Sequence, residues 1–329
     1  MKLQYSLLAL AIVSGSSFAQ LSDTAGFSGE VSISTGFYST ESNLNTNDDN
    51  KKIDDLGAPS DSVSGALILP LGNVAYTFGN GLNQQFYAGT SREDIATGTL
   101  AFELGYKYQL ASGMIINASM LPTIMSGEVW ADPFATGTDR KTTDEDGNAY
   151  RLKVENIAGS KFSVDMAYAI KDIENEQSGV SHPDLSSAEL NSLRRDSKGF
   201  IFKTDYKLAL DQHTILTPRL SYTNIDADGD VNSFTGYGVE LSYFKLMERH
   251  QLALTGGFKT RDYDANFPGT GKARQDDEFS LFAAYEYANI MDWQDWSLIS
   301  LVGFTNSDSN INFYDRTDYI MSVGMNYHF

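Results

Sequence analysis

The sequence of 329 residues lacks cysteine, has only seven prolines, and has no apolar run near the ~20 residues that a membrane-spanning helix needs. A disulfide framework and cysteine metal sites are therefore excluded. Basic residues are also few, with 24 Lys and Arg against 43 Asp and Glu, which gives a formal net charge of −19. Nucleic acid is excluded as a partner, because phosphate binding needs basic patches. Any residence in a membrane would have to use strands.

What the chain has in quantity is tyrosine, phenylalanine and glycine: 18, 19 and 28 residues. A composition rich in aromatic, turn-forming and acidic residues is typical of an outer-membrane β-barrel, although a soluble β-sandwich could have the same composition. The pattern along the chain has to decide between the two.

The first 19 residues form a segment with the features of a secretory signal peptide. Lys2 gives a positive start, Leu7 to Val13 an apolar stretch, and Ser17-Phe18-Ala19 a cleavage site. We therefore expect residues 1–19 to be removed and residues 20–329 to form one domain.

The rest of the chain repeatedly alternates apolar and polar residues with a period of two, which indicates strands with one apolar face. We count 14 strands, with 12–16 possible: residues 27–37, 63–78, 84–91, 100–110, 114–120, 149–157, 162–170, 200–208, 216–222, 237–243, 252–258, 279–287, 296–304 and 319–329. Splitting the second strand at Pro70–Asn73 would give 15. That split would move every later long loop to the other side of the membrane, so we reject it.

The connections between strands alternate in length, with long acidic loops after odd strands and turns of two to five residues after even ones. This asymmetry is typical of a transmembrane antiparallel β-barrel, and an even count predicts that both termini are periplasmic. We expect a further long loop at 264–276. Pro183, Ser186 and Glu189 predict a short helix with a capping box inside the loop 173–197. Either that loop or 126–148 could fold inward and constrict the barrel.

The last strand, Asp318 to Phe329, places an aromatic or aliphatic residue at every second position and ends on one. In a closed barrel this strand would pair with the first, and no edge would remain. Its ending resembles the terminal signal that the barrel assembly machinery recognises, which would assign that role to Tyr327 and Phe329.

If the apolar face of each strand, including Val63, Leu67, Leu69 and Leu71, meets lipid, then the other face lines the interior. The predicted lumen-lining residues are the charged ones on that face: Glu30, Glu103, Lys107, Arg151, Lys153, Asp165, Lys203, Asp205, Lys207, Arg219, Glu240, Lys259, Arg261 and Glu286. They could simply pair across strands and hold the barrel in shape, or they could line a pore. A slight basic excess on this face predicts a weak preference for anionic or zwitterionic solutes.

Sites for catalysis or metal binding are not expected. Of the four histidines, only His182 lies in a predicted external loop, beside Ser181 and Asp184, and adjacent residues rarely make a triad. The stretch from Asn224 to Gly229 resembles the start of a calcium loop, but its twelfth position is Thr235 instead of Glu. We expect no enzyme activity, no metal and no cofactor.

Several segments are similar to those of a known family: residues 76–80, 82–85, 89–92 and 98–101, together with Phe27 to Glu30. On these residues the chain resembles an uncharacterised family of outer-membrane proteins from Vibrio-like bacteria, catalogued as a domain of unknown function. The resemblance implies an outer-membrane address and supplies no functional residues.

The sequence thus predicts an outer-membrane β-barrel, in contact with membrane lipids and lipopolysaccharide, that acts as a passive channel for small hydrophilic solutes. The alternative is a non-conducting barrel whose long acidic extracellular loops bind a surface ligand or partner.

Overall fold

The structure, a computed structural model, describes residues 20–329 except 58–59, 92–93, 96–97, 100 and 124–126. The expected signal peptide, residues 1–19, and Leu100 of the fourth expected strand lie outside the described residues. Among the helices of the described part, none is both long and apolar enough to cross a membrane.

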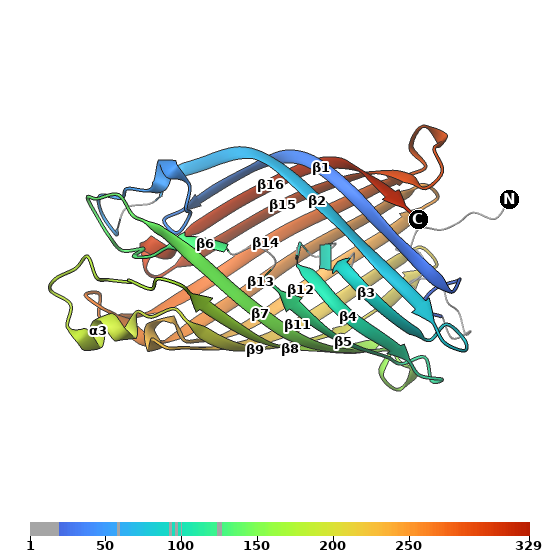
Figure 1. The fold of residues 1–329 in the computed structure, drawn as a ribbon, viewed down its shortest axis with the longest axis horizontal. Helices are drawn as coiled ribbons and strands as arrows, with labels where there is room; N and C mark the ends of the chain where they lie inside the picture. The colour runs from blue at the N-terminus through green and yellow to red at the C-terminus, as the bar shows by residue number, and fades with distance from the viewer. Residues whose placement is uncertain (1–19, 58–59, 92–93, 96–97, 100, 124–126) are drawn as a thin grey trace.

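The described chain is one antiparallel sheet that closes on itself (Figure 1). Its strands are β1 (Gly26–Ser42), β2 (Ser62–Phe78), β3 (Gln84–Thr90), β4 (Phe102–Gln109), β5 (Ile115–Pro122), β6 (Gly127–Trp130), β7 (Thr142–Glu155), β8 (Phe162–Ile173), β9 (Ser197–Tyr206), β10 (Leu208–Asp211), β11 (Thr214–Ala227), β12 (Phe234–Met247), β13 (His250–Phe267), β14 (Lys272–Ala288), β15 (Trp296–Ser309) and β16 (Arg316–His328).

These strands make the predicted 14-strand barrel, because two of them continue a neighbour and add no new wall position. β6 continues β5 along β7, and β10 continues β9 along β11. The break between β9 and β10 falls at Lys207, near Pro218 of β11, which has no N–H to donate. β2 runs unbroken through Pro70, so the 15-strand alternative is wrong. β1 pairs with β16 from Glu30↔His328 to Ser42↔Arg316, which closes the barrel.

The long connections and the short turns lie at opposite ends of the barrel, and β1 begins and β16 ends at the end with the short turns (Figure 1). The predicted helix is present as α3 (Ser187–Ser192), with Ser186 and Glu189 forming the capping box. Two expected loops are partly strand instead. In the expected loop 264–276, β13 continues to Phe267 and β14 already begins at Lys272. In the expected loop 126–148, β7 begins at Thr142. Polar residues occupy both faces of these extensions, so no alternation of apolar and polar residues marks them as strands.

The outer face of the barrel is apolar, as a lipid-facing surface would be. Ile33 and Phe27 of β1 are 64% and 73% exposed, and large apolar side chains are exposed on most other strands too. The inner face carries the small, polar and charged residues. β2 is an exception, since Leu67, Leu69 and Leu71 share a face with Gly36, Ser34 and Ser32 of β1 and so face inward. The expectation that they meet lipid is wrong.

Candidate functional site in the barrel lumen

The candidate site is the barrel interior, where all the predicted lumen-lining residues are placed. Their strand positions put them on the inner face: Glu30, Glu103, Lys107, Arg151, Lys153, Asp165, Lys203, Asp205, Arg219, Glu240, Lys259, Arg261 and Glu286, with Lys207 just after β9. That they line a path for solutes stays a prediction, because most of them contact other side chains of the inner face.

Arg151 is the centre of the largest ion cluster. Its guanidinium donates to Asp165 at 2.9 and 2.6 Å, to Asp94 at 2.8 Å, and to Glu103 at 3.4 Å. The side chains of all four are at most 13% exposed. Such a buried cluster is sensitive to the loss of one partner, because the remaining charges would be left without compensation.

Smaller clusters brace the same inner face on other strands. Arg219 bridges Asp205 and Glu240 at 3.4 and 3.2 Å, joining β9, β11 and β12. At the seam where β16 pairs with β1, Asn326 donates to Glu30 at 2.9 Å. Apart from Lys203, the remaining predicted residues contact neighbouring side chains: Lys153 and Lys207 pair with Glu155, Lys259 and Arg261 pair with Glu278, Glu286 accepts a hydrogen bond from Ser297, and Lys107 lies over the ring of Tyr87. The inner wall is therefore braced by cross-strand pairs.

The slight basic excess inferred from the sequence is compensated in the structure. Asp94 and Glu278 were absent from that count, and they contact Arg151 in one place and Lys259 and Arg261 in the other. The geometry thus gives the expected anion preference no support.

The described residues of the connection between β3 and β4, which are residues 91, 94, 95, 98, 99 and 101, fold into the lumen; we call them the inward loop. Asp94 reaches Arg151 on β7, and Thr99 N–H donates to the Asp94 carbonyl at 2.8 Å. Ile95 lines a cavity of about 70 Å³ together with Leu71, Ala253, Ala284 and Leu301. A Cβ on Gly98 would lie 3.2 Å from Phe282 of β14. The inward loop thus crosses from the β3–β7 side to the β13–β15 side.

This loop was missed at the sequence level, where 126–148 and 173–197 were the candidates for a constriction. Those two loops pack at the outer end of the barrel, where Phe134 and Leu193 belong to one hydrophobic cluster. The available signal was the shortness of the flanking strands: β3 has 7 residues and β4 has 8. Strands that short cannot carry the chain across a membrane, so the connection between them starts at mid-depth.

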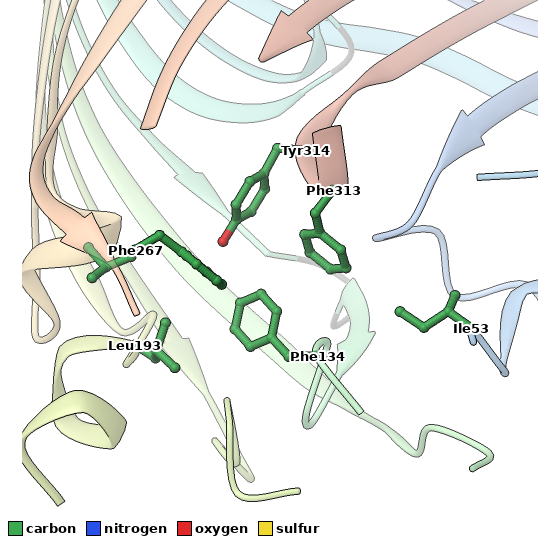
Figure 2. Packing of buried hydrophobic residues seen from close by; sticks show 7 residues of the cluster. Ile53, Phe134, Leu193, Phe267, Phe313 and Tyr314 are labelled. Atoms are coloured by element: carbon green, nitrogen blue, oxygen red, sulfur yellow. The ribbon is translucent and has the colours of Figure 1, made fainter. Parts of the chain in front are cut away.

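The long connections at the outer end pack into one hydrophobic cluster, which we call the cap (Figure 2). Phe134 contacts Phe267 and Phe313, with ring centroids 5.1 and 5.2 Å apart. The full cluster is Ile53, Phe134, Leu193, Val231, Phe267, Phe313 and Tyr314. Because these residues come from connections all around the barrel, the cap ties the outer ends of the strands together.

A buried arginine, Arg140, and a half-buried one, Arg195, hold the loops beneath and beside the cap. Arg140 donates to the carbonyls of Asn43 and Pro133 at 2.7 and 3.0 Å, and to that of Asn50. Burial lowers the pKa of Arg140 to about 10, although Asp132 opposes the change.

Arg195 pairs with Glu176 at 2.9 Å and donates to the Trp130 carbonyl at 2.8 Å. Burial alone would raise the pKa of Glu176, but its hydrogen bond to Arg195 and the arginine charge outweigh burial and lower it. Glu176 and Arg195 therefore form an ion pair at neutral pH.

The two motifs weighed for chemistry belong to the framework. His182 lies in the same loop system, with a ring nitrogen 2.8 Å from the Phe134 carbonyl. Asn224 and Thr235 face each other on β11 and β12, and their side chains hydrogen-bond at 3.2 Å. In the described part of the chain, no group of three or more His, Asp or Glu residues is placed to hold a metal ion.

The model of the family described as "Protein of unknown function (DUF2860)" matches residues 26–328. The chain belongs to the DUF2860 family. No curated protein matches the sequence.

Among solved structures, an outer membrane channel from Pseudomonas putida F1 is similar with a TM-score of 0.45 and 11% identity, over 96% of this chain and 100% of that one. The channel DcaP of Acinetobacter baumannii gives 0.40 and 10%, over 94% and 99%. OmpT of Vibrio cholerae gives 0.37 and 9%, over 94% and 99%. These similarities are too low to transfer a function to this chain.

Proposed function

We propose that this protein is an outer-membrane channel for small hydrophilic solutes whose resting conformation is narrowed at two levels, by the cap and by the inward loop. The apolar exterior supports the membrane location, because a monomeric soluble protein rarely exposes apolar surface on this scale. On this proposal the short turns and both termini lie in the periplasm and the cap faces outward.

The observation that carries the proposal is the Asp94–Arg151 ion pair, 2.8 Å long, which holds the inward loop across the lumen. Fourteen strands enclose more space than the roughly eight whose interior side chains fill. An inward loop that an ion pair holds in place is a constriction that can be removed without rebuilding the wall.

Conductance in planar bilayers tests the proposal. The parent protein is expected to give small or rare current steps, and Asp94→Asn to give larger or more frequent ones, since the amide no longer holds the Arg151 charge. Asp277→Asn, an exposed change on the outer face of β14, is the matched control and should leave the current unchanged. Absence of current from both the parent and Asp94→Asn would refute a channel.

The alternative, a barrel whose outer loops bind a ligand, is favoured by one observation. The loop after β1 and the hairpin β6–β7 enclose a mainly polar cavity of about 560 Å³, lined by Asp48, Lys51, Glu128, Trp130, Arg140 and Lys141. Titration of purified lipopolysaccharide against the parent and a Lys51→Ala, Lys141→Ala double variant would detect such a site, because loss of both ammonium groups should weaken binding of its phosphates.

A further inference from the structure

The inner wall of the barrel differs in chemistry between its two sides. The ion clusters around Arg151 and Arg219 lie on β4, β7, β8, β9, β11 and β12. β15 lies opposite β7 in the closed sheet, because the same number of wall strands separates them in either direction. On β15 the residues that face the lumen include Ile299 and Leu301. The lumen thus has charged clusters on one side and apolar residues on the other.

One row of residues on the inner face is apolar or small all the way from β2, through the closing seam, to β11. Residues that pair directly across antiparallel strands share a face of the sheet, and each member of this row pairs with the next. Gly36 and Ser322 fill the row on β1 and β16. We call the apolar members of the row the track: Leu67, Leu301, Ala284, Ala253, Phe244 and Ile215.

The track runs obliquely through the lumen. Leu67 lies in the outer half of β2, whereas Ile215 is the second residue of β11, at the end of the barrel with the short turns. The strands cross the wall at a slant, so a row of paired residues climbs from one end toward the other (Figure 1). On β14, Glu278 and Glu286 lie on either side of the track. The track is therefore an apolar strip that joins two depths of the lumen between charged residues.

The inward loop covers the middle of the track and leaves its two ends partly exposed. Ile95 borders the same cavity as Ala253, Ala284 and Leu301, so one apolar side chain already rests there. Leu67 and Phe244, toward the two ends, are half-buried on the inner face. On the proposed function the lumen holds water. Apolar side chains that face water bind the apolar part of a solute, because the contact removes both surfaces from water.

We propose that the track binds the side chain of small zwitterionic solutes that carry an alkyl or aryl group, while the charged side of the lumen binds their ammonium and carboxylate groups. Arg219 pairs with Asp205 and Glu240 on that side. Arg151 pairs there with Asp165. Both signs of charge are thus close together, and a zwitterion can meet both, whereas a singly charged solute also meets like charge.

This inference rests on the proposed function, because a solute must enter the lumen to meet the track, and it names the class of solute. Binding of a homologous series to the purified barrel in lipid nanodiscs tests it. Glycine, norvaline and norleucine share the zwitterion and differ in the alkyl chain. Hexanoate keeps the chain of norleucine without the ammonium group. Saturation-transfer NMR measures the binding of each to the parent and to Asp94→Asn, with empty nanodiscs as the blank.

Two variants locate the binding site. Leu67→Ser combined with Phe244→Ser makes the two half-buried positions of the track polar. Ile201→Ser is the matched control, since Ile201 is a half-buried apolar residue on the inner face of β9, away from the track. Heat-dependent gel mobility confirms an intact barrel for each. The solute series on the parent and Asp94→Asn needs neither variant, so the proposal stays testable if one of them fails to fold.

Norleucine is expected to bind about fourfold more tightly than norvaline, because each buried methylene contributes about that factor, and glycine should bind least. The track variant should lose this dependence on chain length, and Ile201→Ser should keep it. Equal binding of glycine and norleucine would overturn the proposal, as would hexanoate that binds as tightly as norleucine, or an equal loss in the control. Conductance of Asp94→Asn reports separately: current without chain-dependent binding would refute the track alone, and binding without current would refute the channel alone.

Discussion

The strands from β11 through β16 to β1 run for 13–18 residues, whereas β3, β4 and β5 run for 7 or 8. In the long sector each strand is hydrogen-bonded on both sides, with apolar residues outside and small or polar ones inside. In the short sector the wall stops at mid-depth, the chain turns into the lumen, and an ion cluster takes over from backbone pairing. One sheet therefore contains a region held by its ladder and a region held by charges.

The largest effect should come from removing the charge at the centre of the short sector. Arg151→Ala leaves Asp94, Glu103 and Asp165 close together in the interior without their shared cation. Breaking a buried ion pair typically costs about 3–5 kcal/mol. We expect a large drop in the urea midpoint of the reconstituted barrel, followed by tryptophan fluorescence. Asp165→Asn in the same background should recover part of the loss, and an Arg151→Ala barrel as stable as the parent would show that the cluster contributes little.

The long sector should be destabilised in a different way, by a side chain added where β1 lies too close to the backbone of β16 to accept one. A Cβ at Gly36 would lie 2.0 Å from the Met321 carbonyl oxygen and 2.7 Å from Ser322 Cα across the closing seam. Overpacking of this kind costs about 1–3 kcal/mol, and occasionally more. Gly36→Ala should lower the heat stability of the folded band on gels. Gly256→Ala, whose Cβ would meet Leu281 at 3.4 Å, is the matched control and should be neutral; equal effects at both positions would contradict the strain.

The same contrast explains how much the sequence could reveal. In the long sector, alternation such as that of Phe279, Leu281 and Tyr285 reports directly which side meets lipid, so the strand number, the turns and the seam were predicted correctly. β2 broke the rule because Leu67 and Leu69 are apolar and face inward. A period of two identifies a strand but does not say which face is outside when both are apolar.

The inward loop and the cap depend on contacts between residues far apart in the sequence. Asp94 and Arg151 are 57 residues apart, and Phe134 packs on Phe313 from the other end of the chain. No local pattern encodes such a pairing. The capping box at Ser186 and Glu189, by contrast, is a contact over three residues, and it was predicted correctly.

A smaller effect is expected where β2 leaves its pairing with β3. Thr90→Val keeps the shape of the side chain but removes the hydroxyl that serves both Gly72 N–H and C=O. Loss of a hydrogen bond of this kind costs about 1 kcal/mol. Hydrogen exchange at the Gly72 amide should accelerate, while amides of β13, hydrogen-bonded on both sides, should keep their rates. Unchanged exchange at Gly72 would mean that another group covers this edge.

The smallest effect should be a loosening of the cap in acid, which separates the cap from both wall sectors. Since the pKa of Glu176 is lowered in the folded protein from its ordinary value of 4.5, the Glu176–Arg195 pair contributes stability that is complete above that value. The contribution is lost as the pH falls below 4.5 and through the lowered pKa.

Trp130, whose carbonyl accepts from Arg195, reports on this step when Trp293 and Trp296 are replaced by Phe. Its emission should shift to the red in acid, whereas between pH 7 and about 5.5 it should stay constant, because Glu176 remains ionised throughout. Glu176→Gln removes the titrating carboxylate and should give a cap that is looser at neutral pH and less sensitive to acid. If Glu176→Gln kept the full acid response, other carboxylates of the loops, and not this pair, would control how the cap opens.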